Sequence, residues 1–154
     1  MNGRVAAVWT KKGTGGVRPE QHSAIELLAG KGVSGDQHFD GRNKLRQVLL
    51  VDVGCLADLG LNPGDLREQV TVAFPGLQDL PPTSLVQIGE AVVKISGDCA
   101  PCRSMAAYLN ENPKSFVTRA MRKRGMLGTV VRSGVVTVGD EVRLCGEVTS
   151  GINA

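Results

Sequence analysis

Two cysteines separated by two residues are the first candidates for chemistry in this chain. Cys99 and Cys102 enclose an Ala-Pro dipeptide in a CxxC pattern. Such a pair can bind zinc, form a redox couple, carry one reactive thiol or consist of two inert thiols. The chain's other cysteines, Cys55 and Cys145, stand alone, so the spacing differs from that of a zinc ribbon. A thioredoxin-like pair opens a helix inside a βαβ unit, whereas this pair follows an expected β-hairpin.

Cys102 is the better candidate of the two because Arg103 follows it directly. A guanidinium beside a thiol favours the thiolate, which is both the nucleophile and the metal ligand. We therefore predict that Cys102 is the catalytic residue. Cys55, in an expected short helix, and Cys145, at the terminal strand, are interpreted as small core or edge residues.

Two further polar clusters can contact a ligand. Asp36 and His38 lie two residues apart after a glycine that allows a tight turn, so they can orient one another or bind a ligand. The alternative is an ordinary turn aspartate and a surface histidine. Arg67, Glu68 and Gln69 precede an expected strand, where they can either meet a ligand at a barrel mouth or form a solvated strand end.

The charge distribution favours a small anionic ligand over a long polyanion. The chain has 18 Lys and Arg against 15 Asp and Glu, and the basic residues gather at 119–124 and around Lys44 and Arg46. Taken alone, the 119–124 run can equally be a solvated helix face. Aromatic residues make up only 3% of the chain, which argues against a base-stacking surface for nucleic acids.

The chain has the features expected of a cytoplasmic protein. It begins without an apolar leader, and none of its segments approaches the roughly 20 apolar residues of a membrane span. We therefore expect no membrane association. In the cytoplasm, the four cysteines are expected to be thiols rather than disulfides.

Short apolar strands and glycine-rich turns dominate the pattern. Strands are expected at 4–9, 23–28, 47–51, 69–73, 85–88, 91–95, 128–132, 135–138 and 141–144. Helices are expected from the Asp52 cap to about Leu59 and from Pro113 to Arg124. We expect loops at 11–21 and 97–105, a hairpin turn at Ser133-Gly134 and a frayed end at 146–154. This pattern predicts a mostly β protein, a closed barrel forming a single domain over residues 1–154.

Taken together and in this order, the clusters resemble the MOSC family, named after the C-terminal domain of molybdenum-cofactor sulfurase. The resemblance covers roughly residues 3–145. Its motifs are Gly32–His38, Arg46–Leu50, Arg67–Val72 with Gln69 in place of the usual Asn, Leu85–Val93, Pro101-Cys102 and Gly134–Val142.

The resemblance implies a pyruvate-kinase-like closed β-barrel with a few short helices and a basic pocket for the molybdenum cofactor, an anionic pterin with a terminal phosphate. Cys102 matches the family cysteine that binds molybdenum or carries sulfur. The cofactor-binding residues implied in this chain are Asp36, His38, Arg46, Arg67, Glu68, Gln69 and Arg103. The family is also associated with pyridoxal phosphate binding.

Three functions follow as hypotheses. The protein can be a cofactor-dependent reductase of N-hydroxylated compounds that takes electrons from a partner, or a sulfur transferase that carries sulfur on Cys102. It can also be a non-enzymatic cofactor carrier or binding module. The expected partners are the small anionic cofactor and a redox or sulfur-donor protein, without nucleic acid or membrane.

Overall fold

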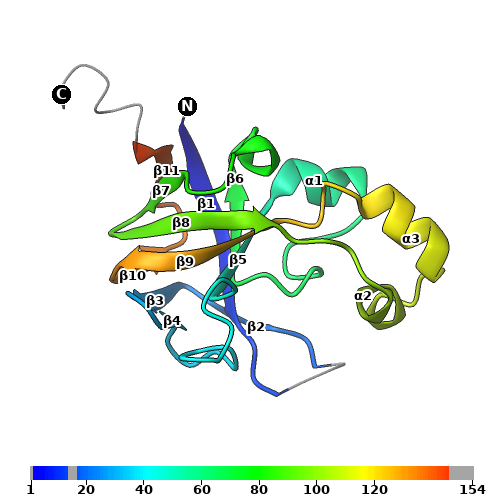
Figure 1. Cartoon of the computed structure of the whole chain (residues 1–154), viewed down its shortest axis with the longest axis horizontal. Coiled ribbons are helices and arrows are strands. Elements are labelled where there is room, and N and C mark those ends of the chain that lie inside the picture. The colour runs from blue at the N-terminus through cyan, green and yellow to red at the C-terminus, as the bar shows by residue number, and fades with distance from the viewer. Residues whose placement is uncertain (1, 14–16, 146–154) are drawn as a thin grey trace.

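The computed structural model, which describes residues 2–13 and 17–145, contains a closed seven-stranded β-barrel (Figure 1). The barrel strands are β1 (Asn2–Thr10), β5 (Val48–Asp52), β6 (Val70–Ala73), β7 (Leu85–Ile88), β8 (Ala91–Asp98), β9 (Met126–Arg132) and β11 (Glu141–Leu144). They follow the order β11-β7-β8-β9-β5-β6-β1, and β1 pairs back with β11. Every pairing is antiparallel except the parallel one between β5 and β6. The predicted closed barrel is confirmed, and the expected frayed end at 146–154 lies outside the described residues.

A small second sheet packs against the barrel. It has the strand order β10 (Gly134–Thr137), β3 (Ala24–Leu28), β4 (Gly32–Val33). The buried side chains of all three strands join the hydrophobic core of the barrel. A further short strand, β2 (Glu20–His22), pairs with the end of β1.

Three short α-helices cover the same side of the barrel (Figure 1). They are α1 (Val53–Asp58), α2 (Arg103–Tyr108) and α3 (Pro113–Ala120), and a short 3-10 helix, η1, spans Leu77–Asp79. Within the described part of the chain, every helix is too short or too polar to cross a membrane.

Strand β5 separates the two hydrophobic clusters of the protein. Val48 and Leu50 point into the barrel, whereas Leu49 and Val51 pack under the helices. This strand is apolar throughout because both of its faces are covered. It therefore joins the barrel to the helical layer that carries part of the candidate site.

The predicted hairpin around Ser133-Gly134 is wrong. Strand β9 pairs with β5 and β8, whereas β10 pairs with β3 in the other sheet. Gly134 lets the chain pass close to Glu90, because a Cβ atom at this position would lie only 2.5 Å from the carbonyl carbon of Glu90. The chain crosses the turn between β7 and β8 at this point instead of folding back on itself.

Three local expectations also need correction. Helix α3 ends at Ala120 rather than at the predicted Arg124, because Met121 leaves the helical conformation with ψ 124° and Arg122 is left-handed with φ 63°. Part of the expected 97–105 loop forms α2, whose N-cap residue Cys102 makes no side-chain capping hydrogen bond and so gave no capping signal. The expected loop at 11–21 begins with a buried residue, Lys11, and ends within β2.

Candidate functional site

A cavity of about 610 Å³ lies between the barrel and one face of α2. Its lining residues are Lys11, Gln37, His38, Arg46, Arg67, Cys102, Ser104, Met105, Ala107, Tyr108 and Arg124. The structure therefore brings four of the predicted site residues, His38, Arg46, Arg67 and Cys102, to one pocket although they are distant in sequence. Their roles in binding remain predictions.

Asp36 lies buried beneath this pocket and organises it. Its carboxylate accepts hydrogen bonds from the backbone N–H groups of Lys11 at 2.6 Å and His38 at 3.0 Å. It also accepts one from Nε2 of Gln69 at 3.1 Å. Asp36 therefore orients the backbone at His38, and it links the end of β1 to the start of β6.

Gln69 spans two elements with its side chain. Its Oε1 accepts a hydrogen bond from the backbone N–H of Leu49 at 2.8 Å, while its Nε2 donates to Asp36. The amide thus connects β5 to the turn below the pocket.

Glu68 and Arg103 occupy different surroundings from the other predicted residues. Glu68 is fully buried, and its Oε2 accepts hydrogen bonds from the Gly64 N–H at 2.8 Å and the Thr71 hydroxyl at 2.6 Å. It supports the turn that leads to Arg67. Arg103 lines a separate groove between α2 and α3 and is not among the residues that line the pocket.

Arg124 is the most informative pocket residue, and sequence reasoning missed it. It is only 6% exposed, and its Nε and Nη1 atoms have no hydrogen-bond partner among residues 2–13 and 17–145. Burial lowers the pKa of the guanidinium, which nevertheless keeps its charge at any physiological pH. Burying unpaired N–H groups of a cation is costly. Arg124 therefore indicates that an anion completes the site.

The neighbouring Gly125 directs Arg124 into the pocket. Gly125 has a φ of 110°, and a Cβ atom there would lie 2.7 Å from the Leu50 carbonyl oxygen. Its own carbonyl accepts hydrogen bonds from the Cys99 N–H at 2.9 Å and from Gln78 Nε2 at 3.1 Å. The chain is thus held tightly against β5 immediately after Arg124.

Lys11 is a second buried cation that the sequence did not single out. It is 7% exposed, and burial lowers its pKa to about 8, an effect that Asp36 opposes and the pocket arginines reinforce. The sequence around Lys11 is rich in glycine and charged residues, which is typical of an exposed loop. The signal that could have found it is the continuous burial expected at the end of β1, which Lys11 directly follows.

Arg67 and His38 complete the polar wall. Arg67 adopts a left-handed backbone with φ 61°, places its guanidinium 5.2 Å from the centre of the Tyr108 ring and donates a hydrogen bond to the Val17 carbonyl. His38 is half-buried, and burial lowers its pKa with a further contribution from Lys11. The imidazole is therefore mostly neutral at pH 7.

The two cysteines of the CxxC pattern have different environments. Cys102 is exposed and lines the pocket, whereas Cys99 is 3% exposed and packs in the cluster under the helices. In the described part of the chain, no group of three or more His, Cys, Asp or Glu residues could hold a metal ion.

Comparison with known proteins identifies the fold and the family. The model of the MOSC domain matches residues 44–143. The crystal structure of YuaD from Bacillus subtilis superposes with a TM-score of 0.76 at 23% identity, covering 92% of this chain and 94% of YuaD. YiiM from Escherichia coli gives a TM-score of 0.69 at 19% identity, covering 94% of this chain and 69% of YiiM. A search of curated protein sequences finds no match. The family match covers most of the barrel and the pocket, and the chain belongs to the MOSC domain family.

Proposed function

We propose that the pocket binds the molybdenum cofactor, with Cys102 as the protein ligand of molybdenum. The observation that carries this proposal is Arg124, a buried guanidinium that lines the pocket and whose Nε and Nη1 atoms have no hydrogen-bond partner among the described residues. Guanidinium groups bind phosphate through paired, charge-assisted hydrogen bonds. Arg124 would hold the terminal phosphate of the cofactor through such hydrogen bonds.

The rest of the polar wall fits the same anion. Lys11, Arg46 and Arg67 line the pocket with Arg124, and none of the four pairs with a carboxylate within the described residues. The nearby Asp36 carboxylate is already engaged by three N–H donors. A net positive pocket therefore remains available, as an anionic cofactor requires.

The opposite wall suits the remainder of the cofactor. Met105, Ala107 and Tyr108 offer apolar and aromatic surface from α2, on which a flat pterin can lie. Cys102 lies at the beginning of the same helix, and its thiolate is a soft ligand appropriate for molybdenum. When bound, the cofactor supplies the two-electron chemistry that reduces N-hydroxylated compounds. The protein's residues anchor the phosphate, orient the pterin and hold the metal.

Replacing the buried cation tests this proposal. The Arg124→Gln and Arg124→Lys variants are purified from cofactor-producing cells beside Arg122→Gln, a control at an exposed arginine. Bound pterin is released by denaturation and quantified by its fluorescence after oxidation. We expect pterin content to fall by about tenfold or more in Arg124→Gln, because charge-assisted hydrogen bonds are lost, and to remain unchanged in the control.

The same preparations distinguish the other two hypotheses. Thermal unfolding first establishes that each variant is folded. Wild-type pterin content in a folded Arg124→Gln variant would contradict the proposal. Protein that carries cyanide-labile sulfur on Cys102 without pterin would instead be a sulfur carrier, and protein that binds pterin without reducing N-hydroxylated compounds would be a cofactor carrier.

A further inference from the structure

The excess positive charge of the chain comes from the segment that forms α2 and α3. Residues 102–124 contain six of the 18 Lys and Arg residues but only one of the 15 Asp and Glu residues. The remainder of the chain therefore has more acidic than basic residues. One of the six cations, Arg124, belongs to the pocket, and the other five are exposed or half-buried. Two of these five, Arg122 and Lys123, follow α3 and pair with Asp79 and Asp58.

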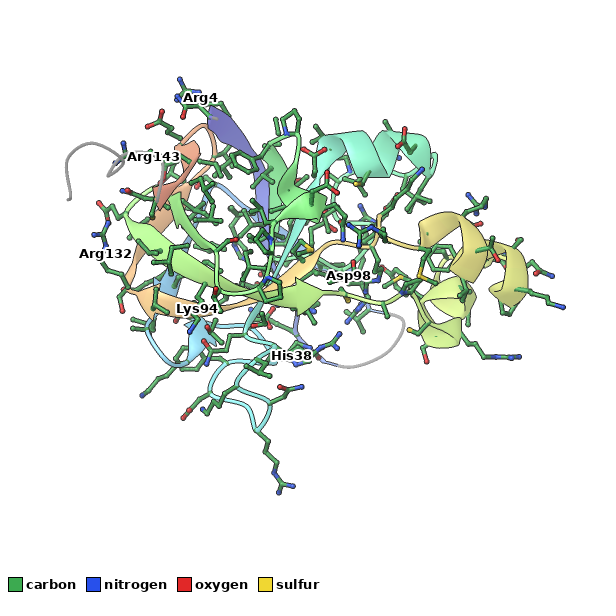
Figure 2. The ribbon with its side chains drawn as sticks, turned by 45° about the horizontal axis from the view of Figure 1, so that its top comes forward. Arg4, His38, Lys94, Asp98, Arg132 and Arg143 are labelled. Atoms are coloured by element: carbon green, nitrogen blue, oxygen red, sulfur yellow. The ribbon has the colours of Figure 1, made fainter. Side chains whose placement is uncertain are left out.

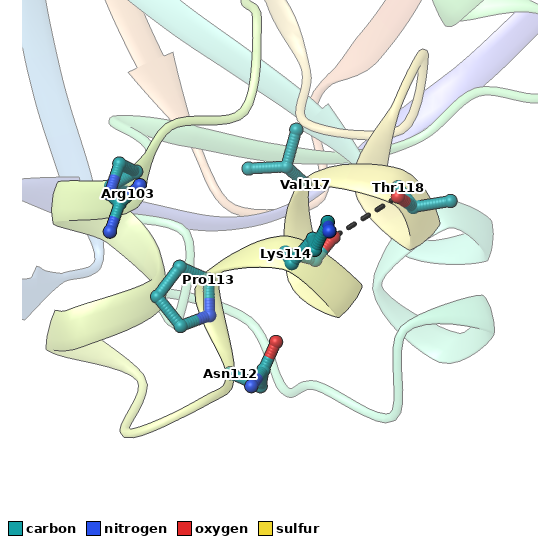
Figure 3. A pocket seen from close by; sticks show the side chains of 6 residues that line it. All are labelled: Arg103, Asn112, Pro113, Lys114, Val117 and Thr118. Carbon is teal, nitrogen blue, oxygen red and sulfur yellow. Dashed lines mark hydrogen bonds between the residues drawn. The ribbon is translucent and has the colours of Figure 1, made fainter.

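A groove runs between these helices and along α3. It consists of two adjoining hollows of about 560 and 460 Å³ that share Asn112, Lys114 and Thr118. Figure 3 shows Arg103 on α2 and Lys114 on α3 at this groove, with Val117 among its lining residues. Within the described residues, Arg103 and Lys114 form no ion pair, whereas Arg119 pairs with Glu111. We call this surface the α2–α3 groove.

Helix α2 and its N-cap residue contribute side chains to both the groove and the pocket. Cys102, Met105 and Tyr108 face the pocket, whereas Arg103 lines the groove. A protein docked in the α2–α3 groove would therefore lie beside the helix whose N-cap residue is Cys102.

We infer that the α2–α3 groove is the docking surface for an acidic electron-donor protein. This inference rests on the proposed function, because reduction of an N-hydroxylated compound requires an external source of electrons. Each R–NHOH takes up two electrons and two protons as its N–O bond breaks, giving R–NH2 and water. The docked donor protein would supply these electrons.

The charges of the groove determine the kind of partner. A basic surface attracts an acidic protein and accelerates the encounter between them, an effect that salt screens. Electron-transfer complexes have small, short-lived interfaces, for which a shallow groove with charged margins is sufficient. Nucleic acid fits this surface poorly, because the chain is only 3% aromatic and the groove lining contains no aromatic residue.

The test compares two electron sources on the cofactor-loaded protein. Flavodoxin hydroquinone serves as the acidic protein donor, and reduced methyl viologen serves as a small cationic donor that needs no docking surface. N-hydroxybenzamidine is the substrate. The groove variant is Lys114→Glu with Arg119→Gln, and the matched control is Lys94→Glu with Arg132→Gln, at exposed positions on the side of the barrel away from α3 (Figure 2).

We expect the groove variant to lower the second-order rate with flavodoxin about tenfold at low ionic strength, with the difference disappearing at high salt. The control variant should react with flavodoxin at the wild-type rate. With methyl viologen, both variants should react at the wild-type rate. If the groove variant and the control variant react with flavodoxin at equal rates, the docking surface is overturned, whereas the proposed function is not. Absence of turnover with methyl viologen in the wild-type protein would overturn the proposed function and this inference with it. Binding of the wild-type groove to anionic vesicles in preference to flavodoxin would also overturn it.

Discussion

The carboxylate of Asp36 accepts a hydrogen bond from the backbone N–H of Lys11 at 2.6 Å, across 25 residues of sequence. This contact fixes the end of β1 against the turn that carries His38. It also places the Lys11 side chain in the pocket although the segment that follows is rich in glycine. The site therefore depends on a buried carboxylate that does not itself line the cavity.

The Asp36→Ala substitution should lower the free energy of unfolding by about 2–4 kcal/mol, because it leaves buried N–H donors without their acceptor. Urea unfolding followed by circular dichroism measures the change. Asp58→Ala is the control, since Asp58 is exposed, lies at the end of α1 and forms an ion pair with Lys123. Equal midpoints for Asp36→Ala and the control would show that Asp36 does not organise the site.

Lys11 should make the stability and the anion affinity of the protein depend on pH. Its pKa falls from 10.5 to about 8 on folding, so its buried charge destabilises the folded protein below pH 8 by about 3 kcal/mol. This penalty declines as the pH rises from 8 towards 10.5. An anion stabilises the charged form, so affinity should fall by up to about tenfold per pH unit above pH 8.

The Lys11→Met variant isolates this titration. Unfolding at pH 7 and pH 9.5 should show that the variant is more stable than the wild type mainly at the lower pH. Titration calorimetry with inorganic pyrophosphate should show an affinity that declines above pH 8 in the wild type and varies less in the variant. His38 contributes little to this window because its pKa is already lowered. Parallel pH profiles for the two proteins would contradict the role of Lys11.

Cys102 should be the thiol that alkylates fastest in the folded protein. It is exposed, whereas Cys99 is buried and burial raises the pKa of the half-buried Cys55. Limited reaction with iodoacetamide at pH 7.5, followed by peptide mass spectrometry, gives the order of reaction. Modification of Cys55 or Cys145 ahead of Cys102 would show that Cys102 is not the most reactive thiol and would contradict its assigned role.

The barrel could be predicted from the sequence because its strands are locally distinct. The apolar segment of β5 and the pair formed by β7 and β8 carry clear strand patterns between glycine turns. The Ser133-Gly134 step misled the prediction, because a glycine that allows close packing on Glu90 looks the same in sequence as a hairpin turn. Which strands β9 and β10 pair with depends on contacts far away along the chain.

The site could be predicted only in part, for a similar reason. Cys102, His38, Arg46 and Arg67 were found because they stand near glycines or strand ends within recognisable motifs. Arg124 belongs to a basic run whose other members are exposed or half-buried, and it precedes Gly125, which packs closely against β5. Burial of a charged side chain is a tertiary property, and composition alone does not reveal it.

The most direct test of the central claim is the molybdenum content of the purified protein. The wild type and Cys102→Ser are produced in cells that make the molybdenum cofactor and in cells that cannot, and metal is measured by mass spectrometry. We predict molybdenum close to one atom per chain only in wild-type protein from cofactor-producing cells, with a severe loss in Cys102→Ser. Equal, negligible molybdenum in wild-type protein from both hosts, with the protein folded, would contradict the claim.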